Sequence, residues 1–144
     1  MKRTKLLVAA MALPMAMTAM TASAAPVEID YWSVFTGGDG ATMQSMVDTF
    51  NESQDEVHVN HTPMTADDLY QKIPLAVQTG TEVPDVAVVH IERIPNFVEN
   101  EMLWSYDEDI LAEAGISAGD YIESAYNASN IDDEQYGIPL DVHS

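Results

Sequence analysis

Residues 27–53 show two hydrophobic periodicities in succession. Residues 27–35 (VEIDYWSVF) alternate apolar and polar side chains, which is typical of a β-strand with one buried face. Beyond a short turn, apolar residues recur at positions i, i+3, i+4 and i+7, the stripe of an amphipathic helix: Met43, Met46, Val47 and Phe50. A strand, a turn and a helix in this order predict the opening unit of an open α/β sheet.

The turn between strand and helix reads TGGDG, residues 36–40. Asp39 is the first choice for the helix N-cap and Thr42 is the second. The turn lacks the Lys-Ser/Thr pair of a P-loop and does not read GxGxxG, so it is no nucleotide signature. A tight turn that needs positive φ explains the glycines somewhat better than a ligand loop does. In an open α/β sheet, however, this turn lies at the carboxyl ends of the strands, where ligands bind.

Two more strands and a helix are predicted by the next residues. Residues 56–62 alternate again, and residues 86–90 form a valine-rich run typical of a parallel strand covered on both faces. Between them Thr65 is expected to cap a helix that Gly80 ends and that Pro74 kinks or restarts. The inward side of this helix is predicted to consist of Leu69, Ile73, Ala76 and Val77.

The remaining chain predicts short helices and an extended end. The helices cover residues 94–102, 108–114 and 117–126, the last with Tyr121, Ile122 and Ala125 on its inner side. Residues 132–134 are predicted to form a polar turn, and residues 136–142 to be extended. Both tryptophans, Trp32 and Trp104, are expected to pack in the interior, with the ligand site as the minority interpretation.

Residues 1–24 have the three parts of a secretory signal peptide. Three basic residues precede an apolar stretch from Leu6 to Met20, and a small-x-small cleavage site ends at Ala24. The apolar stretch is short and contains Pro14, which argues against a membrane anchor. The chain has no cysteine, so neither a lipid-modified cysteine nor a disulfide can form. We expect a protein that is released into the bacterial periplasm and is not anchored in the membrane.

Removal of residues 1–24 leaves an extremely acidic chain. The 120 residues from Ala25 onward carry all 24 acidic residues and only two basic ones, Lys72 and Arg93, a formal charge of −22. Such a field repels nucleic acid and anionic membranes, so neither is an expected partner. Scattered acids indicate a solvated surface in a salty habitat. His58 and His61 lie three apart on a strand and point to opposite faces, so we expect no shared metal ion and no cofactor.

The order of several short segments resembles a known family. The segments are WSVFTGGDG, a helix ending in TFNE, LAVQTGTEVPDV, MLWSYD and QYGIPLDVH. Over residues 27–144 they resemble the N-terminal part of a family 1 extracellular solute-binding protein, the sugar-binding subunit of an ABC importer. The segments TGxxxPDV and YGIPLDVH are the most specific parts of the resemblance.

The resemblance implies a periplasmic-binding-protein-like α/β fold, an open sheet with flanking helices. Members of the family have two such lobes joined by a hinge, and they bind the ligand in the cleft between the lobes. Residues 25–144 would then be an incomplete first lobe, a fragment of a longer chain. The implied partners are a small-molecule ligand, most simply a sugar, and the permease subunits of an ABC transporter, with the full-length protein a monomer.

The candidate ligand-binding residues all fall at the expected carboxyl edge of the sheet. Hydroxyl, carboxyl, imidazole and backbone groups of this kind bind sugar hydroxyls, and the set comprises Thr36, Gly38, Asp39, His90, Glu92, Asp141 and His143. For His90, a capped or solvated loop histidine is an equally good interpretation. No residue is expected to be catalytic. Two alternatives stay open: a polyamine- or metal-cation-binding protein of the same fold, and a secreted carbohydrate-active enzyme with paired carboxylates such as Asp39 and Asp141.

The signal peptide gives the first testable prediction. Expression in a bacterial host with an intact secretion system should yield a protein in the periplasmic extract that begins at Ala25. N-terminal sequencing of that protein decides it, and retention of Met1 or recovery in the membrane fraction would contradict it.

Overall fold

A computed structural model describes residues 25–141, and its centre is a small parallel sheet. The signal peptide predicted at residues 1–24 and the candidate ligand residue His143 lie outside the described residues. The strand order is β2-β1-β3, with β1 (Val27–Ser33) between β2 (Val57–Pro63) and β3 (Val86–Ala87). Both neighbours run parallel to β1, so the predicted open α/β sheet is confirmed.

The two faces of the sheet are covered by different helices. Strands β1 and β2 pair over their whole length, which aligns Ile29 with Val59 and Tyr31 with His61 on one face. Helix α1 (Gly37–Ser53) covers this face. The opposite face is polar where the strands begin, and Trp32 is its large apolar residue. Helix α2 (Ala66–Thr79) therefore covers only the carboxyl half of that face.

Helix α1 begins earlier than its sequence indicated and buries less of its apolar stripe. Its N-cap is Thr36, so the prediction of Asp39 or Thr42 as N-cap is wrong, and Asp39 lies in the first turn instead. Of the stripe, only Val47 is buried, whereas Met46 is 57% and Phe50 44% exposed. The described strands are too few to cover the whole stripe.

The end of α1 also covers the outer edge of β2. The Asn51 side chain donates to the Val59 carbonyl (3.0 Å) and accepts from the Val59 N–H (2.8 Å). Gln54 makes equivalent bonds to Val57, with Nε2 donating to its carbonyl and Oε1 accepting from its N–H. These two amide side chains take the place of a neighbouring strand, which satisfies edge groups that would otherwise invite association.

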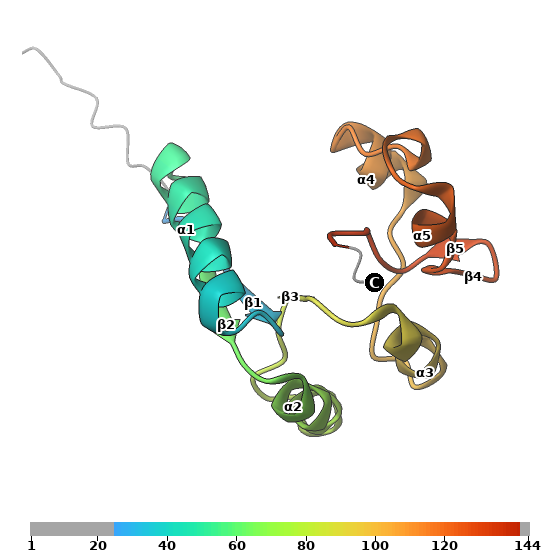
Figure 1. Ribbon diagram of the computed structural model, residues 1–144, viewed down its shortest axis with the longest axis horizontal. Helices are drawn as coiled ribbons and strands as arrows, with labels where there is room; N and C mark the ends of the chain where they lie inside the picture. Colours follow the sequence, from blue (N-terminus) through green and yellow to red (C-terminus); the bar gives the residue numbers. More distant parts are fainter. Residues whose placement is uncertain (1–24, 142–144) are drawn as a thin grey trace, which may run out of the picture.

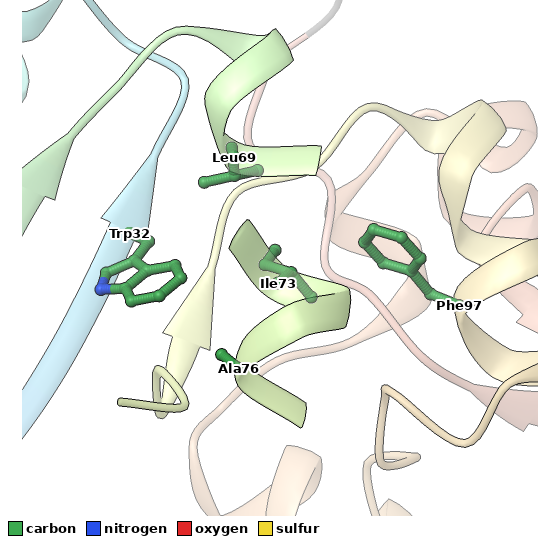
Figure 2. Close-up of a cluster of buried hydrophobic side chains, with 5 residues drawn as sticks. All are labelled: Trp32, Leu69, Ile73, Ala76 and Phe97. Atoms are coloured by element: carbon green, nitrogen blue, oxygen red, sulfur yellow. The ribbon is translucent and has the colours of Figure 1, made fainter. Parts of the chain in front are cut away.

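Helix α2 carries the main hydrophobic core (Figure 2). Leu69, Ile73 and Ala76 face inward and pack between Trp32 of β1 and Phe97, as Figure 2 shows. The predicted caps are confirmed, since Thr65 accepts from the Asp68 N–H and Gly80 ends the helix in the left-handed conformation. Of the two expectations at Pro74, a kink or a restart, the restart is wrong, because one helix runs through that position.

Strand β3 is shorter and more exposed than its apolar sequence predicted. It spans two residues, although the Val88 N–H still donates to the Trp32 carbonyl. Val86 is exposed, so the expectation of a strand covered on both faces is wrong for the described chain. Like β2, strand β3 is an edge strand of the described sheet, with no strand beyond it among residues 25–141.

The chain after β3 forms a second group of short elements (Figure 1). They are η1 (Ile91–Arg93), α3 (Ile94–Glu99), α4 (Glu108–Glu113), η2 (Ala118–Asp120), α5 (Glu123–Asn127) and the hairpin of β4 (Asn130–Ile131) and β5 (Glu134–Gln135). The predicted helix over residues 117–126 is thus two pieces, and Ile122 is 65% exposed rather than on an inner face. The predicted polar turn is confirmed, with positive φ at Asp132 and Asp133. Within residues 25–141 no helix is long and apolar enough to cross a membrane.

The edge-covering role of Asn51 can be tested by alanine substitution. Asn51→Ala removes two hydrogen bonds to Val59 and should lower the free energy of unfolding by about 1–2 kcal/mol. Asn127→Ala is the matched control, because it changes an exposed helical asparagine and makes the same small gain in helix propensity. Urea unfolding measures both, and equal stabilities of the two variants would show that solvent replaces the Asn51 bonds without cost.

Candidate functional site

The carboxyl edge of the sheet brings together two groups of candidate residues. Thr36, Gly38 and Asp39 follow the end of β1, and His90 and Glu92 follow the end of β3. Because β1 and β3 are parallel neighbours, both groups lie at the same edge of the sheet. Open α/β sheets bind ligands at this edge. The edge is therefore the candidate site.

The first turn of α1 leaves polar groups open at this edge. Thr36 is the N-cap, but its side chain makes no capping hydrogen bond to the helix. Gly37 has a φ of +59°, which confirms the turn interpretation of the glycine run, and a Cβ at Gly40 would lie 2.7 Å from the Phe35 carbonyl oxygen. Gly38 has neither a positive φ nor an atom close to where a Cβ would lie, so nothing in the described chain requires glycine there. Exposed amides at a helix N-terminus attract hydrogen-bond acceptors and negative charge.

Tyr70 of α2 holds the segment that follows β3. Its hydroxyl lies 2.8 Å from His90 Nδ1 and accepts from the His90 backbone N–H at 2.9 Å. The guanidinium of Arg93 lies over the Tyr70 ring, 4.6 Å from its centroid. Glu92 lies 3.8 Å from His90 Nδ1, too far for a hydrogen bond. Burial raises the pKa of Tyr70 above its ordinary value, so the phenol is protonated at neutral pH.

A second histidine links three elements beneath the edge. His61 Nε2 lies 2.7 Å from Ser33 Oγ, and His61 Nδ1 lies 3.0 Å from Gln44 Oε1. Gln44 Nε2 donates to Asp48, which leaves Oε1 facing His61. Since a carbonyl oxygen only accepts, His61 Nδ1 carries the proton and the Ser33 hydroxyl donates to Nε2. The His61 ring also stacks on Tyr31, with 5.0 Å between ring centroids.

The remaining candidate residues are placed less favourably. The common rim expected from the first, third and final strands is formed by two strands, because residues 136–141 form no strand. Asp141 lies on that segment. The segment begins beside α3, where a Cβ on Gly137 would lie 3.2 Å from Ile94 Cδ1. The structure thus brings the Asp39 and His90 groups to one edge, whereas Asp141 lies on a segment that forms no strand and His143 lies outside the described residues.

The two tryptophans have opposite environments. Trp32 is buried, as predicted, and the Lys72 ammonium lies over its ring at 4.1 Å. Trp104 is 91% exposed, so the prediction that it packs in the interior is wrong. It lines a shallow, open hollow together with Val98, Glu101, Leu103, Ser105 and Tyr136.

The comparison with family models identifies the family. The model described as bacterial extracellular solute-binding protein matches residues 45–144. The chain belongs to this family. Among curated relatives of this solute-binding protein is the arabinooligosaccharide-binding protein of Halalkalibacterium halodurans, which is 28% identical over 119 residues. That alignment covers 80% of this chain and 25% of the relative.

Solved structures of sugar-binding proteins share the fold. The sugar-binding protein MalE from Xanthomonas citri matches with a TM-score of 0.70 and 18% identity over 78% of this chain. The galacto-N-biose/lacto-N-biose I-binding protein of Bifidobacterium longum matches with a TM-score of 0.69 and 22% identity over 84%. Identities this low establish the fold alone. The solute-binding chain spans 28% and 30% of these two proteins, so it corresponds to well under half of each.

Three residues at the edge were not singled out from the sequence of this solute-binding protein. They are Tyr70, Arg93 and Gln44. Leu69 is on the predicted inward side of its helix, and Tyr70 is the next residue along the chain. This neighbourhood could have suggested that Tyr70 lies near the strand ends. Within residues 25–141 no group of three or more His, Cys, Asp or Glu side chains is placed to hold a metal ion.

The partly buried position of His61 predicts a pH dependence of stability. Burial lowers the pKa of His61 below its ordinary value, so folding favours the neutral ring. The resulting stability is complete above the unfolded pKa, about 6.5, and is lost as pH falls through the lowered folded pKa. Between pH 7.5 and 5.5 in high salt, the parent should therefore lose more unfolding free energy than His61→Gln does.

The control for this measurement is His58→Gln, which removes an exposed histidine from the same strand. We expect it to keep the pH dependence of the parent. Urea titrations at several pH values give the slopes. Identical slopes for the parent and His61→Gln would contradict the assignment.

Proposed function

We propose that this solute-binding protein captures a sugar and delivers it to the permease of an ABC transporter. The observation that carries the proposal is the family match over residues 45–144. The names of the relatives supply the ligand class, since they bind arabinooligosaccharides, lacto-N-biose or cyclic maltosyl-maltose. The proposed role is binding without turnover, in the space outside the cytoplasmic membrane and after removal of residues 1–24.

The chemistry of the candidate site supports a polyhydroxylated ligand. The first turn of α1 offers the Thr36 hydroxyl, backbone amides near Gly38 and the Asp39 carboxylate. The other side of the edge offers His90 and Glu92, both at least partly exposed. Sugar hydroxyls donate and accept hydrogen bonds, so alternating acceptors and donors suit them.

We further propose that residues 25–144 form part of the N-terminal lobe of a two-lobe protein. The ligand would lie between this lobe and a second one, and closure of the hinge would cover it. Two features support this proposal: the chain spans 25–30% of its relatives, and apolar groups are exposed on α1 and at β3. The full-length protein is proposed to be monomeric.

A cationic ligand is the second candidate, and one observation favours it. The residues beyond Ala24 carry 24 acidic and two basic side chains, and such a field attracts polyamines and metal cations. A thermal-shift screen of the full-length protein separates the candidates. Stabilisation by arabinotriose or maltotriose supports the sugar. Stabilisation by spermidine alone, lost in high salt, supports the cation.

Alanine substitution at the edge tests the site once the screen has found a sugar. Loss of a buried hydrogen bond to a sugar hydroxyl costs about 1–3 kcal/mol, so Asp39→Ala should weaken binding about ten- to a hundred-fold. Asp141→Ala should do the same if residues 136–141 reach the ligand in the full-length protein. Isothermal titration calorimetry measures the dissociation constants.

The control variant is Asp55→Ala. Asp55 lies between α1 and β2, at the opposite edge of the sheet, and should leave affinity within about two-fold. Unfolding curves confirm that each variant keeps its fold. If Asp39→Ala binds as tightly as Asp55→Ala, the proposed site is wrong although the family assignment stands.

A further inference from the structure

We propose that Tyr70 is a positioning residue that fixes His90 as the Nε2–H tautomer, so that His90 presents an N–H donor to a ligand oxygen. The tautomer follows from the hydrogen bonds that the protonated Tyr70 phenol makes to His90. The ligand contact rests on the proposed function. Tyr70 lies on α2 and His90 on the segment after β3, so the contact joins two elements at the candidate site.

The hydroxyl of Tyr70 has two hydrogen-bond partners within the described chain, and both are atoms of His90. Its oxygen accepts from the His90 backbone N–H at 2.9 Å, and this N–H can only donate. Its second partner within the described chain is His90 Nδ1 at 2.8 Å. Since the phenol is protonated, its single hydrogen is satisfied when it points at Nδ1. Nδ1 is then an acceptor, and the proton of the neutral imidazole must be on Nε2.

The packing around Tyr70 holds its hydroxyl in place, so that it can fix the tautomer of His90. Its ring packs edge-on against Phe97, with 6.2 Å between centroids, and carries Arg93 on its face. The preceding residue, Leu69, is fully buried in the core. The hydroxyl also bonds both the backbone and the ring of His90, which fixes the orientation of the imidazole. The His90 side chain is 43% exposed, and Nε2 is its nitrogen that Tyr70 does not use.

The other histidines provide internal references. His61 donates from Nδ1 to Gln44 Oε1, so it has the opposite tautomer. His58 is exposed, and no hydrogen bond within the described chain restricts its ring, so it reports the unbiased mixture. One protein thus contains a ring fixed as Nδ1–H, a ring proposed to be fixed as Nε2–H and an unrestricted ring.

Nitrogen chemical shifts of the histidine rings test the tautomers directly. Long-range ¹H–¹⁵N spectra of the full-length protein, labelled on histidine, are recorded at pH 8, and His58→Gln, His61→Gln and His90→Gln assign the signals. In the parent, His90 should show a protonated Nε2 and an unprotonated Nδ1, and His61 the reverse. In Tyr70→Phe, the His90 shifts should move to those of His58, while His61 stays unchanged.

The matched control is Tyr126→Phe, which removes a tyrosine hydroxyl that makes no hydrogen bond within residues 25–141. It should leave all three patterns as in the parent. Two results would overturn the proposal: a protonated Nδ1 at His90 in the parent, or unchanged His90 shifts in Tyr70→Phe. Both are independent of any ligand.

Affinity measurements then test the link to the ligand. With arabinotriose or whichever screened sugar binds, Tyr70→Phe and His90→Gln should each weaken binding about five-fold. The double variant should be no weaker than His90→Gln, because Tyr70 acts through His90. Additive losses would overturn the positioning role. If no sugar binds at all, the proposed function fails and the ring spectra still decide the role of Tyr70.

Discussion

The burial of Trp32 against α2 is the contact on which the rest of the structure depends. One face of β1 and β2 is polar where the strands begin, so the indole at the end of β1 is the main apolar surface there. Helix α2 covers it with Leu69, Ile73 and Ala76, and Phe97 of α3 closes the cluster. This position puts Tyr70 next to the strand ends, where it reaches His90. The geometry of the candidate site is thus a consequence of where the core formed.

The two basic residues beyond Ala24 both take part in this region. Lys72 lies over Trp32, and Arg93 lies over Tyr70, so each cation contacts an aromatic face. Contacts of this kind are worth about 0.5–1 kcal/mol at exposed sites. Lys72 also forms an ion pair with the exposed Glu82, at 3.8 Å between Nζ and Oε2. The position of the two cations on the two rings places the positive charge beside the core and beside the candidate site, while most carboxylates stay hydrated.

Local patterns predicted the sheet, the caps of α2 and its inward side, because those depend on residues close in sequence. The alternation in residues 27–33 and the Thr65 and Gly80 signals are of this kind. The environments of Trp104, Ile122 and Phe50 depend on what packs against them, which periodicity does not report. Placing the strand-end residues at one edge followed from the parallel topology. The Tyr70–His90 contact could not be predicted, since it depends on how α2 packs against the segment that follows β3.

The candidate site needs a second wall to be effective. A hydrogen bond that His90 donates to a sugar, or that Asp39 accepts from one, competes with water at an open edge and contributes little. Exclusion of water lowers the local dielectric, and the same bonds then discriminate between ligands because an unpaired group becomes costly. Ligand pockets accordingly bury most of the surface of their ligand. In the proposed two-lobe protein the described residues would supply one side of such a pocket, and the hydrogen bond of Tyr70 to His90 is formed within this chain alone. A preset donor on one wall reduces the ordering cost when the other wall closes, which is how a small number of hydrogen bonds can yield specific binding.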